Sequence, residues 1–94
     1  MDRLESMAMF LSVVDAGGFG AAARRTGQPL ATVSRKVSEL ENHLKVSLLT
    51  RSARGVALTD SGQSYYADCR RVIDALMEAE RAAAGEYTTP RGEL

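Results

Sequence analysis

Residues 29–44, PLATVSRKVSELENHL, decide how this chain folds. Their apolar side chains recur at helical spacing, at Val33, Val37, Leu40 and Leu44. One narrow apolar stripe of this kind predicts a helix that lies on a small core and leaves its other side free.

The free side of this helix is small and polar apart from one arginine. At 100° per residue, the side chains that point away from the stripe are those of Ala31, Arg35, Ser38 and Asn42, with Thr32 and Ser34 on the flanks. Short hydroxyls and one long guanidinium can approach base edges in the major groove of B-DNA, which is ~12 Å wide. We therefore expect a helix that enters a DNA groove, with an ordinary amphipathic surface helix as the alternative.

The sequence before this stretch predicts two more helices. Apolar side chains at Leu4, Met7, Phe10, Leu11 and Val14 predict a first helix over residues 3–15 with one buried face. Gly17 ends that helix, Phe19 follows as an apolar anchor, and residues 21–25 predict a short second helix. Gly27 allows a left-handed helix end, and Pro29 suits the start of the next helix. Two helices joined by so short a turn predict a helix-turn-helix.

The sequence after residue 44 predicts a small hairpin. Residues 48–51 and 56–59 are β-prone, and the polar, basic loop of residues 52–55 separates them. Beside a helix-turn-helix, such a hairpin is a wing. We therefore predict a mainly α-helical fold in which residues 1–58 form a winged helix-turn-helix domain, with three helices and a two-stranded wing.

Residues 59–84 predict one long helix. Thr59 is a credible N-cap, whereas Gly62 stands near the position where a capping box needs Glu or Gln, which indicates close packing there. We expect an apolar seam to form a dimer interface with the same helix of a second copy, through Tyr66, Cys69, Ile73, Leu76 and Ala83. A frayed distal tail is the alternative. Residues 85–94 are expected to form a linker.

Charge is distributed unevenly along the chain. The formal net charge is zero, yet residues 21–58 carry seven basic and two acidic side chains. A local basic patch of this kind favours contact with phosphates. The single cysteine, Cys69, excludes an internal disulfide, fits a cytoplasmic protein and is expected to be packed rather than reactive. No stretch is long enough for a membrane span, and the N-terminus lacks a signal-peptide pattern.

Several blocks of residues resemble, in order and spacing, the N-terminal DNA-binding domain of the LysR-type transcriptional regulators. They are Gly18-Phe19, Ala21-Ala22-Ala23-Arg24, Thr32-Val33-Ser34-Arg35-Lys36-Val37, Leu40-Glu41, Leu48-Leu49-Thr50-Arg51 and Leu58-Thr59-Asp60-Ser61-Gly62. The resemblance implies a bacterial regulator that binds an inverted-repeat operator as a homodimer, with its long helices paired antiparallel. It also implies that residues 85–94 lead to a separate effector-binding domain. A small-molecule effector, and any tetramer, would then depend on parts outside this chain.

Two departures from the family pattern affect these expectations. Residues 29–31, Pro-Leu-Ala, differ from the commoner Ser-Gln-Pro, so the base preference at this helix end does not carry over. Lys45 stands where the family prefers Gly after the recognition helix. If the backbone is left-handed there, Lys costs about 1 kcal/mol relative to Gly.

The expected DNA contacts come from the central helix and from the wing. They are Ala31, Thr32, Ser34, Arg35 and Ser38 of the helix, and Arg51 and Arg54 of the wing. Arg35 is the first candidate for direct readout, since a guanidinium can bond guanine O6 and N7 together, with a phosphate contact as the alternative. Arg51 and Arg54 suit phosphate or minor-groove contacts, with solvated loop charges as the alternative. Arg24 and Lys36 are secondary candidates.

Three classes of function differ in how well they fit these features. Sequence-specific binding of double-stranded DNA is the leading hypothesis, and a winged-helix module that binds protein is the alternative. Catalysis is the weakest hypothesis, because one His, one Cys and no Gly-rich phosphate loop supply no convergent acids, bases or nucleophile. His43 has no neighbouring pattern of metal ligands, so we expect no metal and no cofactor.

Overall fold

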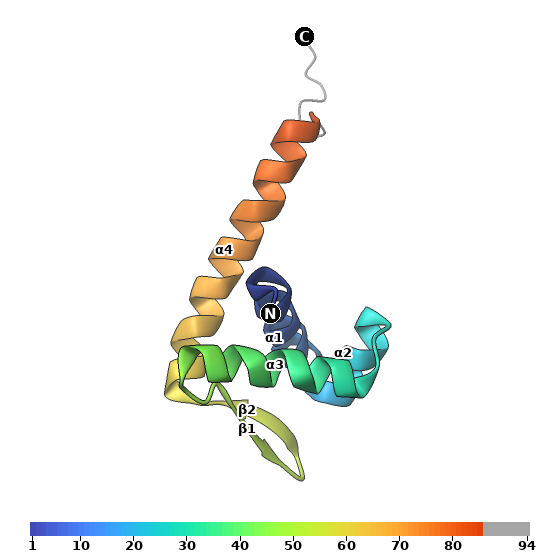
Figure 1. Cartoon of the computed structure of the whole chain (residues 1–94), viewed down its shortest axis with the longest axis vertical. Helices are drawn as coiled ribbons and strands as arrows, with labels where there is room; N and C mark the ends of the chain where they lie inside the picture. The colour runs from blue at the N-terminus through green and yellow to red at the C-terminus, as the bar shows by residue number, and fades with distance from the viewer. Residues whose placement is uncertain (86–94) are drawn as a thin grey trace.

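The computed structural model describes residues 1–85, and this part of the chain contains four helices and one two-stranded sheet. The elements in order are α1 (Arg3–Ala16), α2 (Phe19–Thr26), α3 (Leu30–Leu44), β1 (Leu49–Ser52), β2 (Gly55–Leu58) and α4 (Asp60–Ala84). Figure 1 shows α1, α2 and α3 gathered at one end of α4, with the hairpin of β1 and β2 projecting away from the free end of α4. The predicted winged helix-turn-helix followed by a long helix is confirmed. Apart from Gly85, the predicted linker lies outside the described residues.

Helix α1 is buried on two sides. One side packs against α4 and the end of α3, in a cluster of Met7, Phe10, Leu11, Leu40, Leu48 and Cys69. The other side packs against α2 and α3, in a cluster of Met9, Val13, Phe19, Ala22, Val33 and Val37. The prediction of a single buried face is therefore wrong, because α1 lies between two sets of elements. Leu4, which was predicted on that face, is 43% exposed.

Glycines end both helices that precede α3. Gly17 ends α1 at φ 88°, and Gly27 ends α2 at φ 68°, both in the left-handed region that glycine adopts without strain. Helix α2 begins at Phe19, two residues earlier than predicted, so the apolar anchor is itself the first residue of the helix. Pro29 is the N-cap of α3.

The wing is an antiparallel hairpin. Leu49 pairs with Leu58, and Ser52 pairs with Gly55 across the turn. Strand β1 begins one residue later than predicted and β2 one residue earlier. Leu48, which precedes β1, is only 1% exposed and belongs to the cluster around α1. The leucine before the strand therefore joins the wing to the core.

The wing leads into α4 through a tight junction. The Thr59 hydroxyl accepts a hydrogen bond from the Gly62 N–H at 2.9 Å and donates one to the Ser47 carbonyl at 2.7 Å. The Thr59 N–H donates to the Leu48 carbonyl at 3.0 Å. A Cβ atom placed on Gly62 would lie 2.0 Å from the same Leu48 oxygen. The predicted N-cap and the predicted close packing at Gly62 are both confirmed.

The first half of the α4 seam is covered by this chain itself. Cys69 is fully buried in the cluster around α1, and Tyr66 and Ile73 pack against that cluster. The prediction that Cys69 faces a second copy is therefore wrong, since α1 already covers its side of the helix. Tyr66 and Ile73 are half-buried, and their contact with a second copy stays a prediction. Burial raises the pKa of the Cys69 thiol, which keeps it in its less nucleophilic form.

A polar cluster joins the start of α4 to the end of α1. The Tyr66 hydroxyl donates to the Asp15 carboxylate at 2.5 Å, and the Arg70 guanidinium forms an ion pair with that carboxylate. Arg70 also donates to the Tyr66 hydroxyl at 3.2 Å. Hydrogen bonds to Tyr66 and Asp15 raise the pKa of Arg70 above its usual range. These contacts help to fix the direction in which α4 leaves the domain.

The distal half of α4 has no such cover within the described residues. Leu76 lies seven residues, or one heptad, after Cys69 on the same side of the helix, yet it is 37% exposed. Val72 and Met77 are 46% and 48% exposed, and Ala83 is exposed. An apolar surface therefore continues along α4 beyond the folded domain.

Within residues 1–85, no single helix is long and apolar enough to cross a membrane. Helices α1 and α2 together meet the length and composition of a span, but a bend of 114° separates them.

Candidate nucleic-acid interface

Helix α3 presents a polar face to solvent. Val33, Val37 and Leu40, at 1% exposure or less, turn one side of the helix into the core and so fix which side remains outside. Ala31, Arg35 and Ser38 are exposed on the outer side, and Thr32 and Ser34 are half-buried on its flanks. All five residues predicted on this helix therefore lie on one continuous surface.

Arg35 is the long cationic side chain at the middle of this surface. Its Nη1 lies 3.5 Å from Oε2 of Glu39, one turn further along α3, and 58% of its side chain is exposed. An exposed ion pair of this length is weak. The guanidinium is therefore free to exchange Glu39 for a base edge or a phosphate.

Lys36, a secondary candidate for DNA contact, is engaged within the fold. Its Nζ lies 3.3 Å from Oε1 of Glu5 on α1, and only 17% of its side chain is exposed. This ion pair joins the first turn of α1 to the first half of α3. Sequence reasoning did not identify Glu5, because the two residues are far apart in the chain.

The wing carries two arginines in different surroundings. The Arg51 guanidinium lies 3.8 Å from the centre of the Phe19 ring, at the first residue of α2. This cation–π contact holds the strand of Arg51 against the helix-turn-helix and limits the freedom of its side chain. Arg54 lies in the exposed turn between β1 and β2, where its N–H donates to the Ser52 hydroxyl at 3.2 Å.

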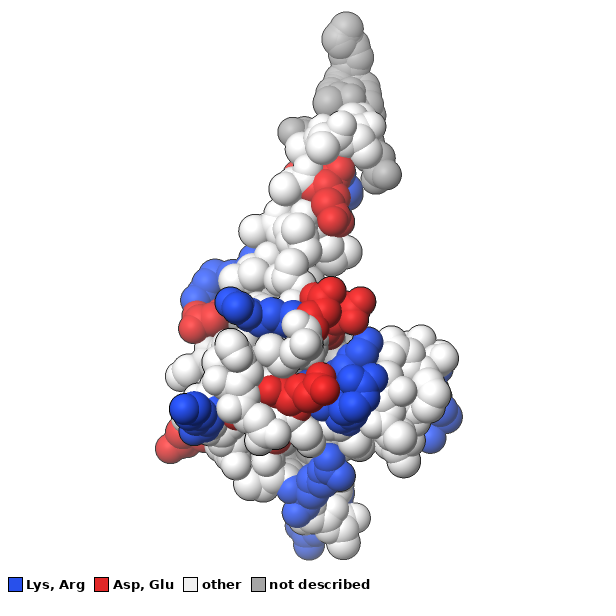
Figure 2. Space-filling model, in the orientation of Figure 1, with Lys and Arg blue, Asp and Glu red and all other residues white. Residues whose placement is uncertain are grey.

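Basic side chains gather at one end of the molecule. Figure 2 shows blue atoms along the wing and across α3, with red atoms beside those of α3. The exposed arginines of this surface are Arg24 and Arg25 on α2, Arg35 on α3, and Arg51 and Arg54 on the wing. The free end of α4 points the other way (Figure 1). A polyanion bound at the basic end would leave the apolar part of α4 accessible.

Glu41 fixes the wing relative to α3. Its Oε2 accepts hydrogen bonds from the backbone N–H of Leu48 at 2.7 Å and of Leu49 at 3.1 Å. One carboxylate on α3 thereby positions the start of β1. The sequence placed Glu41 only within a family motif. No local pattern predicts that its carboxylate accepts hydrogen bonds from the backbone of Leu48 and Leu49, seven and eight residues later.

Replacing Glu41 with Ala is expected to lower the free energy of unfolding by about 2 kcal/mol, since two partly buried N–H groups lose a charged acceptor. Urea unfolding followed by circular dichroism measures the loss. Glu39→Ala is the matched control, because within residues 1–85 the Glu39 carboxylate pairs only with the exposed Arg35, and its loss should stay below about 0.5 kcal/mol. Equal losses for the two variants would contradict the role assigned to Glu41.

Lys45 follows α3 in a left-handed conformation, at φ 60° and ψ 39°. It is the one non-glycine residue with positive φ in the described part of the chain. Its N–H donates to the Glu41 carbonyl and closes the helix. The condition stated for Lys45 is therefore met, and we expect a cost of about 1 kcal/mol relative to Gly.

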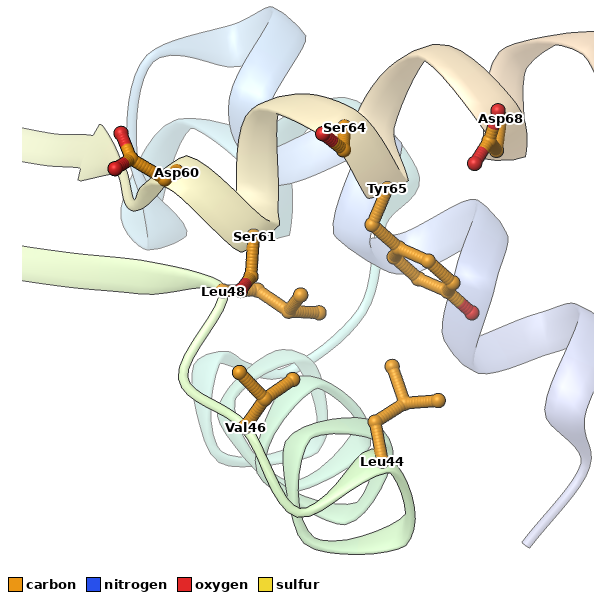
Figure 3. A pocket seen from close by; sticks show the side chains of 8 residues that line it. All are labelled: Leu44, Val46, Leu48, Asp60, Ser61, Ser64, Tyr65 and Asp68. Atoms are coloured by element: carbon orange, nitrogen blue, oxygen red, sulfur yellow. The ribbon is translucent and has the colours of Figure 1, made fainter.

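A shallow groove of about 520 Å³ lies between the end of α3 and the start of α4, away from the basic surface. Figure 3 shows Leu44 and Val46 pointing towards α4, from which Tyr65 points back. The remaining lining residues are Leu48, Asp60, Ser61, Ser64 and Asp68. Its charged residues are two aspartates, so the groove disfavours phosphate and is not part of the candidate interface.

Comparison with known proteins identifies the family. The model of the bacterial regulatory helix-turn-helix proteins of the lysR family matches residues 4–63. The chain belongs to this LysR family. The matched residues include α2, α3, the wing, nearly all of α1 and the start of α4.

Curated relatives of this LysR-family chain are transcriptional regulators. It is 45% identical over 94 residues to an HTH-type transcriptional repressor of Pseudomonas aeruginosa (strain UCBPP-PA14). It is 39% identical over 94 residues to the HTH-type transcriptional activator AaeR of Escherichia coli (strain K12). Both matches cover all of this chain and 30% of the relative, so the chain spans about a third of the length of these regulators. One is named a repressor and the other an activator, so the direction of regulation is not common to them.

A solved structure of the same family contains DNA. The crystal structure of a CbnR_DBD-DNA complex matches this LysR-family chain with a TM-score of 0.79 at 34% identity. The match covers 90% of this chain and 98% of the other.

Proposed function

We propose that this chain is the DNA-binding part of a bacterial LysR-type transcriptional regulator and binds double-stranded DNA in a sequence-specific manner. The observation that carries the proposal is the outer face of α3, which presents one arginine among small and hydroxyl side chains beside an arginine-bearing wing. A helix with such a face fits the major groove, and the wing arginines fit the flanking backbone. The similarity to the CbnR_DBD-DNA complex supports the same reading. A bacterial protein that binds chromosomal DNA would act in the cytoplasm, and the proposal includes this location.

The proposed binding unit is a homodimer on an inverted repeat. The exposed apolar side chains of the distal half of α4 support pairing with a second α4, since monomeric proteins rarely leave such a line uncovered. Antiparallel pairing would place one recognition helix at each end of the dimer. Each would then enter one half-site.

Selection of bound sequences from a random duplex library at near-physiological salt tests the proposal. Enrichment of an inverted repeat supports a dimer that recognises sequence. Enrichment of single half-sites supports sequence recognition but contradicts dimerisation at the concentration used. If no sequence is enriched at a salt concentration low enough for general binding, the proposal of sequence-specific binding is wrong.

Replacing Leu76 with Asp is expected to weaken the dimer at least tenfold, because a carboxylate would replace an apolar side chain in the interface. Sedimentation equilibrium of both proteins measures the dissociation constant. Ala67→Asp is the matched control, since Ala67 is exposed on the opposite side of α4. Circular dichroism should show the same helix content in all three proteins. A Leu76→Asp dimer as stable as the control would exclude this face.

A further inference from the structure

One exposed apolar side chain lies on the helix that is proposed to bind DNA. The large hydrophobic side chains exposed in the described part of the chain are Met1, Leu4, Leu30, Val46, Val72, Leu76 and Met77. Three of them lie along the distal half of α4, two lie at the N-terminal end of the chain, and Val46 lines the groove in Figure 3. Leu30 alone belongs to α3.

Leu30 lies at the N-terminal end of α3, and in a helix-turn-helix the N-terminal residues of the recognition helix contact base edges. It is the first residue of the helix and is 53% exposed, whereas Val33 in the same turn is fully buried. Residues four apart share a helix flank, so Leu30 lies in line with Ser34 and then Ser38. Side chains of a helix lean towards its N-terminus, which carries the Leu30 isobutyl group beyond the first turn of α3.

The chemistry of this helix end is entirely apolar. Pro29, Leu30 and Ala31 are consecutive and exposed, and none has a polar atom in its side chain. Side chains here cannot hydrogen-bond a base edge, so any discrimination that they make is by van der Waals contact. In the major groove, thymine is the base that offers an apolar group, its C5-methyl.

We infer that Leu30 contacts the C5-methyl group of a thymine in each half-site and makes that position specific for thymine. The inference rests on the proposed function, because it requires α3 to lie in the major groove. Isolated leucines on protein surfaces are common and need no explanation by themselves. What distinguishes Leu30 is its place at the N-terminal end of α3, on the flank that also carries the hydroxyls of Ser34 and Ser38.

Replacement of thymine with deoxyuridine tests the contact, because it removes only the methyl group. Each thymine of the selected operator is replaced in turn, and the affinity of the unchanged protein is measured by fluorescence anisotropy. Burial of one methyl corresponds to about a fourfold change in affinity. We expect this loss at one thymine per half-site. Leu30→Ala should bind the thymine operator about as weakly as the unchanged protein binds the uracil operator, and should show no further loss with uracil.

Val46→Ala is the matched control, since it truncates an exposed aliphatic side chain that lies outside α3. This variant should keep the full difference between thymine and uracil. If the difference is equally large in Leu30→Ala, or if no thymine shows one, the assignment to Leu30 is wrong while the proposed function stands. Failure of the library selection to yield any operator would overturn both.

Discussion

Replacing Gly62 with Ala is expected to lower the free energy of unfolding by about 3 kcal/mol, the largest loss of stability that we expect from a single added methyl group. The added Cβ would lie 2.0 Å from the Leu48 carbonyl oxygen and 3.1 Å from Cδ2 of Leu58. A backbone oxygen cannot move aside as a flexible side chain can. The start of α4 would therefore have to separate from the wing, which breaks the junction around Thr59.

Gly20→Ala is the control for this prediction. Gly20 lies inside α2, and a Cβ there would meet only the end of the Arg24 side chain, at an ordinary contact distance of 3.6 Å. Alanine has a higher helix propensity than glycine, so this variant should gain about 0.5–1 kcal/mol. Urea unfolding of both variants gives the two values. If both variants lose stability by similar amounts, the close contact with the Leu48 carbonyl is not the reason that position 62 needs glycine.

The sequence predicted those features of the fold that depend on neighbouring residues. Helical periodicity predicts α3 and α4, and glycines predict the ends of the helices. The glycine that interrupts the capping-box pattern predicts the close packing at Gly62. Each of these signals is contained in a window of a few residues. The left-handed backbone at Lys45 was only a condition drawn from the family pattern, because a lysine gives no local sign of positive φ.

What the sequence did not predict depends on contacts between distant residues. Helix α1 has apolar side chains on two sides, and each side is buried only because a different set of elements packs against it. The same packing buries Cys69 against α1. The Glu41 carboxylate and the Phe19 ring each meet residues of the wing. In the candidate interface, periodicity predicted which α3 side chains are exposed, but not that Lys36 is paired with Glu5.

Replacing Arg35 with Ala is expected to reduce affinity for the selected operator by about 5- to 150-fold, which corresponds to the ~1–3 kcal/mol of a bidentate contact with guanine. The side chain is 58% exposed and its weak pair with Glu39 gives the fold little stability, so the variant should unfold at the same urea concentration. Affinity for random duplex DNA should fall much less. Titrations of both duplexes at one salt concentration give the ratio.

Arg54→Ala separates a base contact from a phosphate contact. Arg54 lies in the turn of the wing, and the loss of one phosphate neutralisation should weaken binding to both duplexes alike and reduce the salt slope by about one unit. Arg35→Ala should instead keep most of its effect as salt rises, because a hydrogen-bonded base edge releases no counterion. If Arg35→Ala weakens operator and random DNA equally and shows the salt behaviour of Arg54→Ala, then Arg35 contacts phosphate. Specificity would in that case come from the smaller side chains of α3.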